Sequence, residues 1–286
     1  MKTLTKLTGI ALLATTMAGC ATTTTTKYSE DNSRAYNLAQ AGGLYKARDT
    51  ALGDEEYSSA MTNITNAFSD AALFNSSAGL GLSGGASLGL GLAGALFAAP
   101  GHMERDSAFA FVPTSEAASR EEADELLRDS FFNAVQEAAA ELGYTIEHKG
   151  NDLRHPAAHG RTAMSIAVVD EENGCYGYER IKSGNDAKAY GCYVSLQIPE
   201  RGERTLPAPE AVNVPGSVYT YPATDHKESM RFFFLPNEDA TMAKLPLAVK
   251  ISEHMPEWFF LYLAPEDDQP PMILEQGEPE LFIKKA

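Results

Sequence analysis

The first 19 residues constrain this chain most, because they have the parts of a segment that is removed before the rest folds. Met1 to Gly19 carries two lysines near its start, a short apolar run from Ile10 to Ala14, and small residues at its end. A positive start, a short apolar stretch and small residues before a cleavage point are typical of a secretory signal peptide. We therefore expect residues 1–19 to be removed and the remaining chain to fold in an oxidising compartment.

Cys20 follows directly after the small residues Met17, Ala18 and Gly19. A cysteine at this point resembles the lipobox of bacterial lipoproteins. That resemblance implies that the Cys20 thiol receives diacylglycerol, that a dedicated peptidase cuts before it, and that the new amino terminus is acylated too, with chains such as palmitate. The membrane is then a partner of the protein through acylated Cys20. The alternative is an ordinary signal peptide that is followed by a cysteine.

Residues 20–30 are expected to form a flexible tether between lipid and protein, because five consecutive threonines lie in a stretch without apolar periodicity. The residue after Cys20 is alanine. In the enterobacterial lipoproteins that this N-terminus resembles, aspartate at that position retains the protein on the inner membrane. The resemblance therefore implies an outer-membrane lipoprotein, with its domain on the periplasmic side or at the cell surface.

The chain is strongly acidic, with a formal net charge of −16 over 286 residues. Nucleic acids and anionic lipid headgroups are bound by clusters of Lys and Arg, so this balance argues against both as partners. The mature chain is long enough for one large domain or two modest ones. Membrane attachment is expected to be hydrophobic rather than electrostatic.

Two cysteines remain after Cys20. Cys175 and Cys192 flank a polar, loop-like segment, and an even pair in an exported chain predicts a disulfide bond. Such a cross-link would stabilise the fold by about 3 kcal/mol through the unfolded state. Two free buried thiols, or a catalytic or metal-binding pair, are the alternatives.

A glycine-rich segment without formal charge extends from Ala71 to Pro100 and is long enough to enter or cross a bilayer. Small residues recur in it at four-residue steps, which on a helix make one smooth face for close helix packing. These residues are Ser77, Gly81, Gly85, Gly89 and Ala93. The pattern resembles the glycine zipper of some outer-membrane lipoproteins, which implies self-association through residues 77–97. A buried Gly-rich hairpin and a flexible linker are the alternatives, and we assign residues 31–103 to one helical and membrane-associating unit.

The remaining residues, 104–286, are predicted to form an α+β domain with a mixed or antiparallel sheet and few helices. Ser119 and Glu122 form a capping box that opens a helix, which Gly143 ends, between strands at 108–112 and 144–148. Further strands are predicted over 163–169, 190–198, 231–235, 258–263 and 281–284, with a helix over 245–254.

Catalytic and metal-binding patterns are weak. Ser83 and Ser87 each lie in a G-x-S-x-G pattern, typical of serine hydrolases, but a run this rich in Gly and Ser produces the pattern by composition. His155 and His159 have the spacing of two metal ligands on a helix, yet Pro156 and the nearby glycines indicate a loop. The sequence has no phosphate-binding loop and no dinucleotide fingerprint, so no cofactor is predicted.

The function that these features favour is a non-enzymatic outer-membrane lipoprotein that serves as an interaction or assembly component of an envelope system. Two alternatives stay open. One is an envelope ester or lipid hydrolase with Ser83 or Ser87 as nucleophile. The other is an oligomeric pore or membrane-perturbing protein built from the glycine-rich segment. The sequence does not identify a protein partner.

Overall fold

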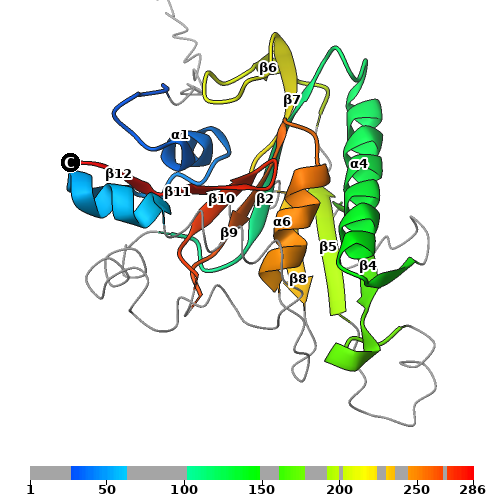
Figure 1. Ribbon diagram of the computed structural model, residues 1–286. Coiled ribbons are helices and arrows are strands. Elements are labelled where there is room, and N and C mark those ends of the chain that lie inside the picture. Colours follow the sequence, from blue (N-terminus) through cyan, green and yellow to red (C-terminus); the bar gives the residue numbers. More distant parts are fainter. Residues whose placement is uncertain are drawn as a thin grey trace, which may run out of the picture.

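The computed structural model gives the protein a body of two antiparallel sheets with helices packed on them (Figure 1). The structure describes residues 27–62, 102–148, 161–177, 192–199, 202–223, 230–235, 244–266 and 269–286.

The larger sheet has six strands in the order β11-β10-β9-β2-β7-β6, and all neighbours pair antiparallel. Its strands are β2 (Ser107–Pro113), β6 (Leu206–Pro207), β7 (Ser217–Tyr221), β9 (Phe259–Leu263), β10 (Met272–Glu275) and β11 (Glu278–Leu281). The central strands β2 and β9 are buried at every position. Because alternate residues of a strand point to opposite faces, both faces of this sheet must be covered.

The smaller sheet has four antiparallel strands in the order β3-β4-β5-β8. They are β3 (Thr145–His148), β4 (Arg161–Val169), β5 (Cys192–Pro199) and β8 (Arg231–Leu235), with a short 3-10 helix, η2 (Glu171–Asn173), after β4. A separate ribbon pairs β1 (Thr50–Leu52) with β12 (Ile283–Lys285) in parallel. The α+β class with mixed strand pairing is therefore confirmed.

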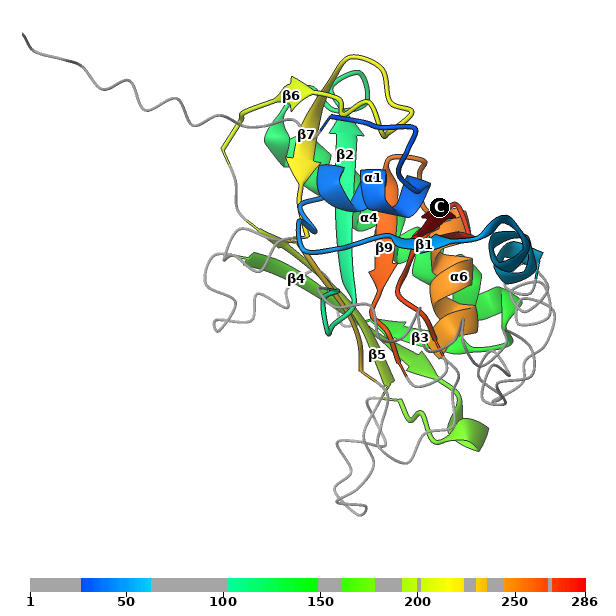
Figure 2. The same ribbon diagram turned by 90° about the vertical axis from the view of Figure 1, so that its left-hand side faces the viewer.

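Helices cover both faces of the large sheet (Figure 2). They are α1 (Arg34–Ala41), α4 (Arg120–Glu141) and α6 (Lys244–His254). A further helix is formed by residues 54–62. The Phe109 ring packs against the backbone of Gly42, just after α1, so closely that a Cβ there would clash. Its neighbour in β2, Ala110, points to the other face and pairs with Tyr221, whose hydroxyl is bonded to Asp124 of α4. Thus α1 lies on one face of the sheet, and α4 lies on the other beside α6.

Helix α4 begins and ends as its sequence predicts. The Ser119 side chain accepts a hydrogen bond from the Glu122 backbone, while the Glu122 carboxylate accepts one from the backbone N–H of Ala118. Its apolar side covers the small sheet, where Phe131 meets Phe232 of β8 edge to face. The strands on either side of α4 are present, but β2 lies in the large sheet and β3 in the small one. The helix therefore connects two sheets.

The region before residue 104 differs most from expectation. Helix α1 ends at Ala41, and the chain then turns into β1, which lies within the range 31–103 that is predicted to form one helical unit. Leu38 and Leu44 are buried in the same core as β2 and β9. Described residues on both sides of the expected boundary at 104 therefore pack together.

Candidate functional site

The first described residues are fixed to the body at the start of α1. The backbone N–H of Ser29 donates to the Asn37 side chain at 3.2 Å, and the Asn37 amide donates back to the Ser29 carbonyl at 2.9 Å. Ser33 is the N-cap of α1: its hydroxyl accepts from the Tyr36 N–H at 2.9 Å and donates to Asp49 at 2.5 Å. We call this point, where the predicted tether reaches the folded body, the tether root.

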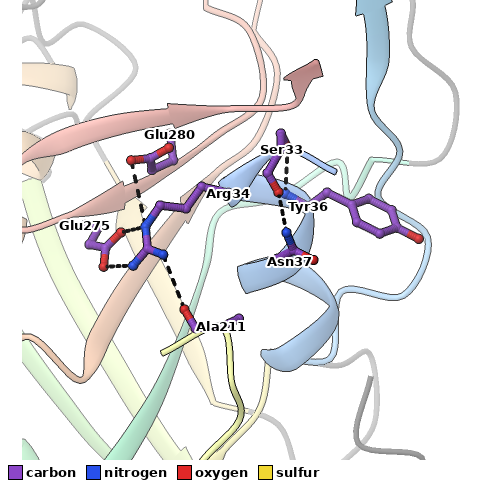
Figure 3. A network of polar contacts seen from close by, with 7 residues as sticks. All are labelled: Ser33, Arg34, Tyr36, Asn37, Ala211, Glu275 and Glu280. Atoms are coloured by element: carbon purple, nitrogen blue, oxygen red, sulfur yellow. Dashed lines mark hydrogen bonds and ion pairs between the residues drawn. The ribbon is translucent and has the colours of Figure 1, made fainter. Parts of the chain in front are cut away.

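Arg34, the first residue of α1, joins the tether root to the large sheet (Figure 3). Its guanidinium forms a bidentate ion pair with Glu275 at the end of β10. It lies 4.0 Å from the carboxylate of Glu280 in β11 and donates to the Ala211 carbonyl at 3.4 Å. One arginine on α1 thus faces two glutamates on a β-hairpin.

The hairpin brings its glutamates to one face by its register. Glu275 pairs directly with Glu278, and Glu280 points to the same face two residues further along β11. The turn between the strands has Gln276 at φ 51° and Gly277 at φ 82°, as a tight two-residue hairpin requires. Three carboxylates consequently gather on the side of the sheet that Arg34 approaches.

The turn of this hairpin is held by α6. The Gln276 amide donates to the carbonyl of Met255, and the Gly277 N–H donates to the Ser252 hydroxyl at 3.1 Å. The hairpin is therefore attached to α6 at its tip and to α1 through Arg34.

Acidic groups outnumber the cation at this site. Burial, together with the nearby charge of Glu275, raises the pKa of Glu280 to about 7, although Arg34 opposes the shift. The hydrogen bonds to Glu275 raise the pKa of Arg34, so the guanidinium stays charged. The site can therefore take up one proton near neutral pH without losing its ion pair.

A second arginine joins α4 to the opposite face of the sheet. Arg120 is 3% exposed and forms an ion pair with Asp124 at 3.1 Å. Its guanidinium carbon lies 3.9 Å from the centre of the Tyr221 ring, within the range of a cation–π contact. The Tyr221 hydroxyl donates to the same carboxylate at 2.5 Å, and burial raises the pKa of that phenol. The Glu203 carboxylate also accepts a hydrogen bond from the Arg120 backbone N–H at 2.9 Å, and the charge of Arg128 acts on the Tyr221 phenol as well.

Only one of the sequence-predicted pairs lies within the described residues. Cys175 and Cys192 form a disulfide bond, which joins the start of β5 to the residues just after η2 and confirms the prediction. The other candidates lie outside the described residues. They are Cys20, Ser77, Gly81, Ser83, Gly85, Ser87, Gly89, Ala93, His155 and His159.

Two further searches cover only the described part of the chain. No group of three or more His, Cys, Asp or Glu side chains there is arranged to hold a metal ion. None of the helices described is long and apolar enough to span a bilayer.

Sequence reasoning missed both arginine sites. The spacing of Arg120 and Asp124, four residues apart at the start of a capped helix, is a signal that was present. So was the Gln276-Gly277 pair between two short β-prone stretches, which would have predicted the hairpin. Nothing local connects Arg34 to Glu275, which lies 241 residues away.

Comparison of the chain with family models, with curated proteins and with solved structures finds no match.

Proposed function

We propose that the protein is a non-enzymatic outer-membrane lipoprotein that serves as an interaction or assembly component of an envelope system. Acylated Cys20 is its anchor, and the body that follows the tether is presented at the membrane surface. The signal-peptide pattern and the cysteine after it support the anchor, and the disulfide between Cys175 and Cys192 is consistent with an oxidising compartment.

The observation that carries the proposal is the tether root. Ser29 and Asn37 fix the chain to the body, so only residues 21–28 separate the lipid from a folded contact. A chain of that length spans at most about 30 Å when fully extended. Acylation at Cys20 would therefore hold the body within about 30 Å of the bilayer, where it can meet other envelope components.

The anchor is tested by metabolic labelling with a palmitate analogue in an exporting bacterium, followed by separation of inner and outer membranes. Wild type should carry the label and fractionate with the outer membrane, whereas Cys20→Ser should be unlabelled and released. The double variant Cys175→Ser/Cys192→Ser is the matched control, because it removes the other cysteines and should keep the label. An unlabelled wild type, or a labelled Cys20→Ser protein, would contradict the proposal.

The assembly role is tested on the glycine-rich segment. Gly85→Leu places a large side chain on the proposed small-residue face, and Gly84→Leu makes the same change beside it. Detergent-resistant oligomers of the acylated protein should be lost in Gly85→Leu and kept in Gly84→Leu. Oligomers that respond equally to both changes, or a monomeric wild type, would argue against self-association through residues 77–97.

A further inference from the structure

Residues at or near three connections of the described body contact one strand. Residue 27 lies within the predicted tether, 20–30, and residues 62 and 102 flank the stretch that contains the glycine-rich segment. The chain would therefore reach its lipid-associating parts through these three points. Their positions decide which side of the body the membrane can occupy.

His102 itself, and residues five positions from the other two points, contact β12 or the residue before it. Lys284 of β12 lies within 3.5 Å of the Asn32 side chain, close to the tether root. Lys285 lies 5.7 Å from the ring of Tyr57 in the helical segment 54–62. His102 packs its ring edge-on against Phe282 at 4.6 Å between centroids. The β1–β12 ribbon and α1 form this side of the molecule, which faces the viewer in Figure 2; we call it the α1 face.

The loop that connects α1 to β1 exposes an aromatic side chain and two cations, the residue types that contact lipid headgroups. Tyr45 is 60% exposed and is the one large apolar side chain among the described residues that is exposed to this degree. Lys46 and Arg48 beside it are exposed as well. The Arg48 guanidinium donates to the carbonyls of Tyr45 and Ala47 at 3.0 and 2.7 Å, which holds the loop in shape. Tyrosine with flanking cations is the combination enriched where a protein meets the membrane interface.

The opposite face is formed by α4, which carries carboxylates along its exposed side. Helix α4 exposes a row of carboxylates: Glu121, Glu122, Glu125, Asp129, Glu137 and Glu141. Glu141 forms an ion pair with Lys250 at 2.9 Å, and Glu137 and Glu141 both lie within 3.0 Å of His254. A negative membrane surface would repel this row. The α1 side exposes carboxylates too, among them Asp54, Glu55 and Glu56, so the orientation is set by the chain connections and by the loop that carries Tyr45 rather than by net charge.

We propose that the body lies with its α1 face against the bilayer, with Tyr45, Lys46 and Arg48 at the lipid headgroups, and with the acidic α4 face directed away from the membrane. This orientation rests on the proposed function, because it needs the lipid anchor at Cys20. It assigns the α4 face to contacts with protein or solvent.

The test uses full-length, acylated protein on vesicles of phosphatidylethanolamine and phosphatidylglycerol whose acyl chains carry bromine, a quencher of indole fluorescence. Tyr45→Trp places the probe in the proposed contact, and Gln136→Trp places it on the exposed side of α4. The native Trp258 is 1% exposed and gives both variants the same background. Emission of the added indole should be lost in Tyr45→Trp and kept in Gln136→Trp.

Quenching of Gln136→Trp, or of neither variant in vesicle-bound protein, would overturn the orientation. Flotation with the vesicles separates this failure from that of the anchor: acylated wild type that does not float overturns the lipid anchor itself and the orientation with it. Lys46→Glu should in addition reduce the quenching of Tyr45→Trp, whereas Arg204→Glu, an equal charge change at another exposed site, should leave it unchanged.

Discussion

Arg34 and Arg120 each connect a helix to one face of the large sheet, but the charges and the solvent around them differ. Each lies at the first position of a helix and joins that helix to a strand. The side chain of Arg120 is 4% exposed and has Asp124 as its ion-pair partner, whereas that of Arg34 is 37% exposed and faces Glu275 and Glu280. A buried site must balance its charges, since an unpaired ion there is costly. A half-exposed site tolerates an extra carboxylate, and the result is a group that titrates near neutral pH.

The largest expected effect comes from breaking the balanced site. Arg120→Ala leaves the Asp124 carboxylate without its cation and removes the packing on Tyr221, so unfolding should become easier by about 4 kcal/mol. Urea denaturation at pH 7 measures the change. Arg204→Ala removes an exposed arginine and should change stability by less than about 0.5 kcal/mol. Equal losses in the two variants would refute the assignment of Arg120 as a buried anchor.

Glu280→Gln should stabilise the protein, and only at high pH. The folded protein binds this proton more tightly than the unfolded chain does, because the pKa of Glu280 is raised from 4.5 to about 7. The stability that goes with the bound proton is therefore full below pH 4.5 and is lost as the pH rises through about 7. At pH 8 the variant should gain at most about 3 kcal/mol over wild type.

Thermal unfolding at pH 8 and at pH 4.5 measures this gain. Glu278→Gln is the matched control, since Glu278 lies on the same face of the hairpin but is exposed, and its effect should be small at both pH values. A gain for Glu280→Gln that is equal at the two pH values would count against a titrating group at this position.

Arg34→Met should cost about 1–2 kcal/mol, less than the loss at Arg120, because solvent already screens the Arg34 ion pair. The loss should be larger at pH 8, where Glu280 is ionised and the carboxylates repel each other, than at pH 5. Adding Glu280→Gln to Arg34→Met should recover part of the loss at pH 8. Chemical denaturation of the two single variants and the double variant measures the coupling, and strict additivity at pH 8 would show that Arg34 and Glu280 do not interact.

The smallest expected difference in stability is between variants of the two helix caps, Ser33 and Ser119. Ser33→Ala removes both the cap of α1 and the bond to Asp49, whereas Ser119→Ala removes an exposed cap alone. We expect losses of about 1.5 and about 0.5 kcal/mol. Hydrogen exchange of the first amides of α1 and α4 reports each cap separately. A larger loss at Ser119 would mean that the tether root is not rigidly held.

The sequence predicted elements whose signals are local. Ser119 and Glu122 marked the start of α4, and β8 was predicted over the residues that it occupies, because capping and apolar runs are properties of neighbouring residues. The disulfide between Cys175 and Cys192 was predictable because two cysteines are left after Cys20 in a chain that is expected to be exported, and such a pair is expected to be bonded.

The features that decide the candidate site are not local. The parallel pairing of β1 with β12 joins Thr50 to Ile283, and Arg34 reaches a hairpin near the C-terminus. No periodicity within α1 indicates such a partner. Leu38 lies in α1, within the range 31–103 that is predicted to be helical, whereas Leu44 follows the end of α1. Both are buried in a core whose strands follow much later in the chain.

Hydrogen exchange on membranes tests the central claim, that the lipid anchor holds the α1 face against the bilayer. Acylated wild type and Cys20→Ser protein would each be mixed with phosphatidylethanolamine and phosphatidylglycerol vesicles, and backbone exchange compared. We predict slower exchange over 42–52 in the acylated protein alone, with α4 exchanging equally in both. Slowing confined to α4, or identical exchange in the two proteins throughout, would contradict the account.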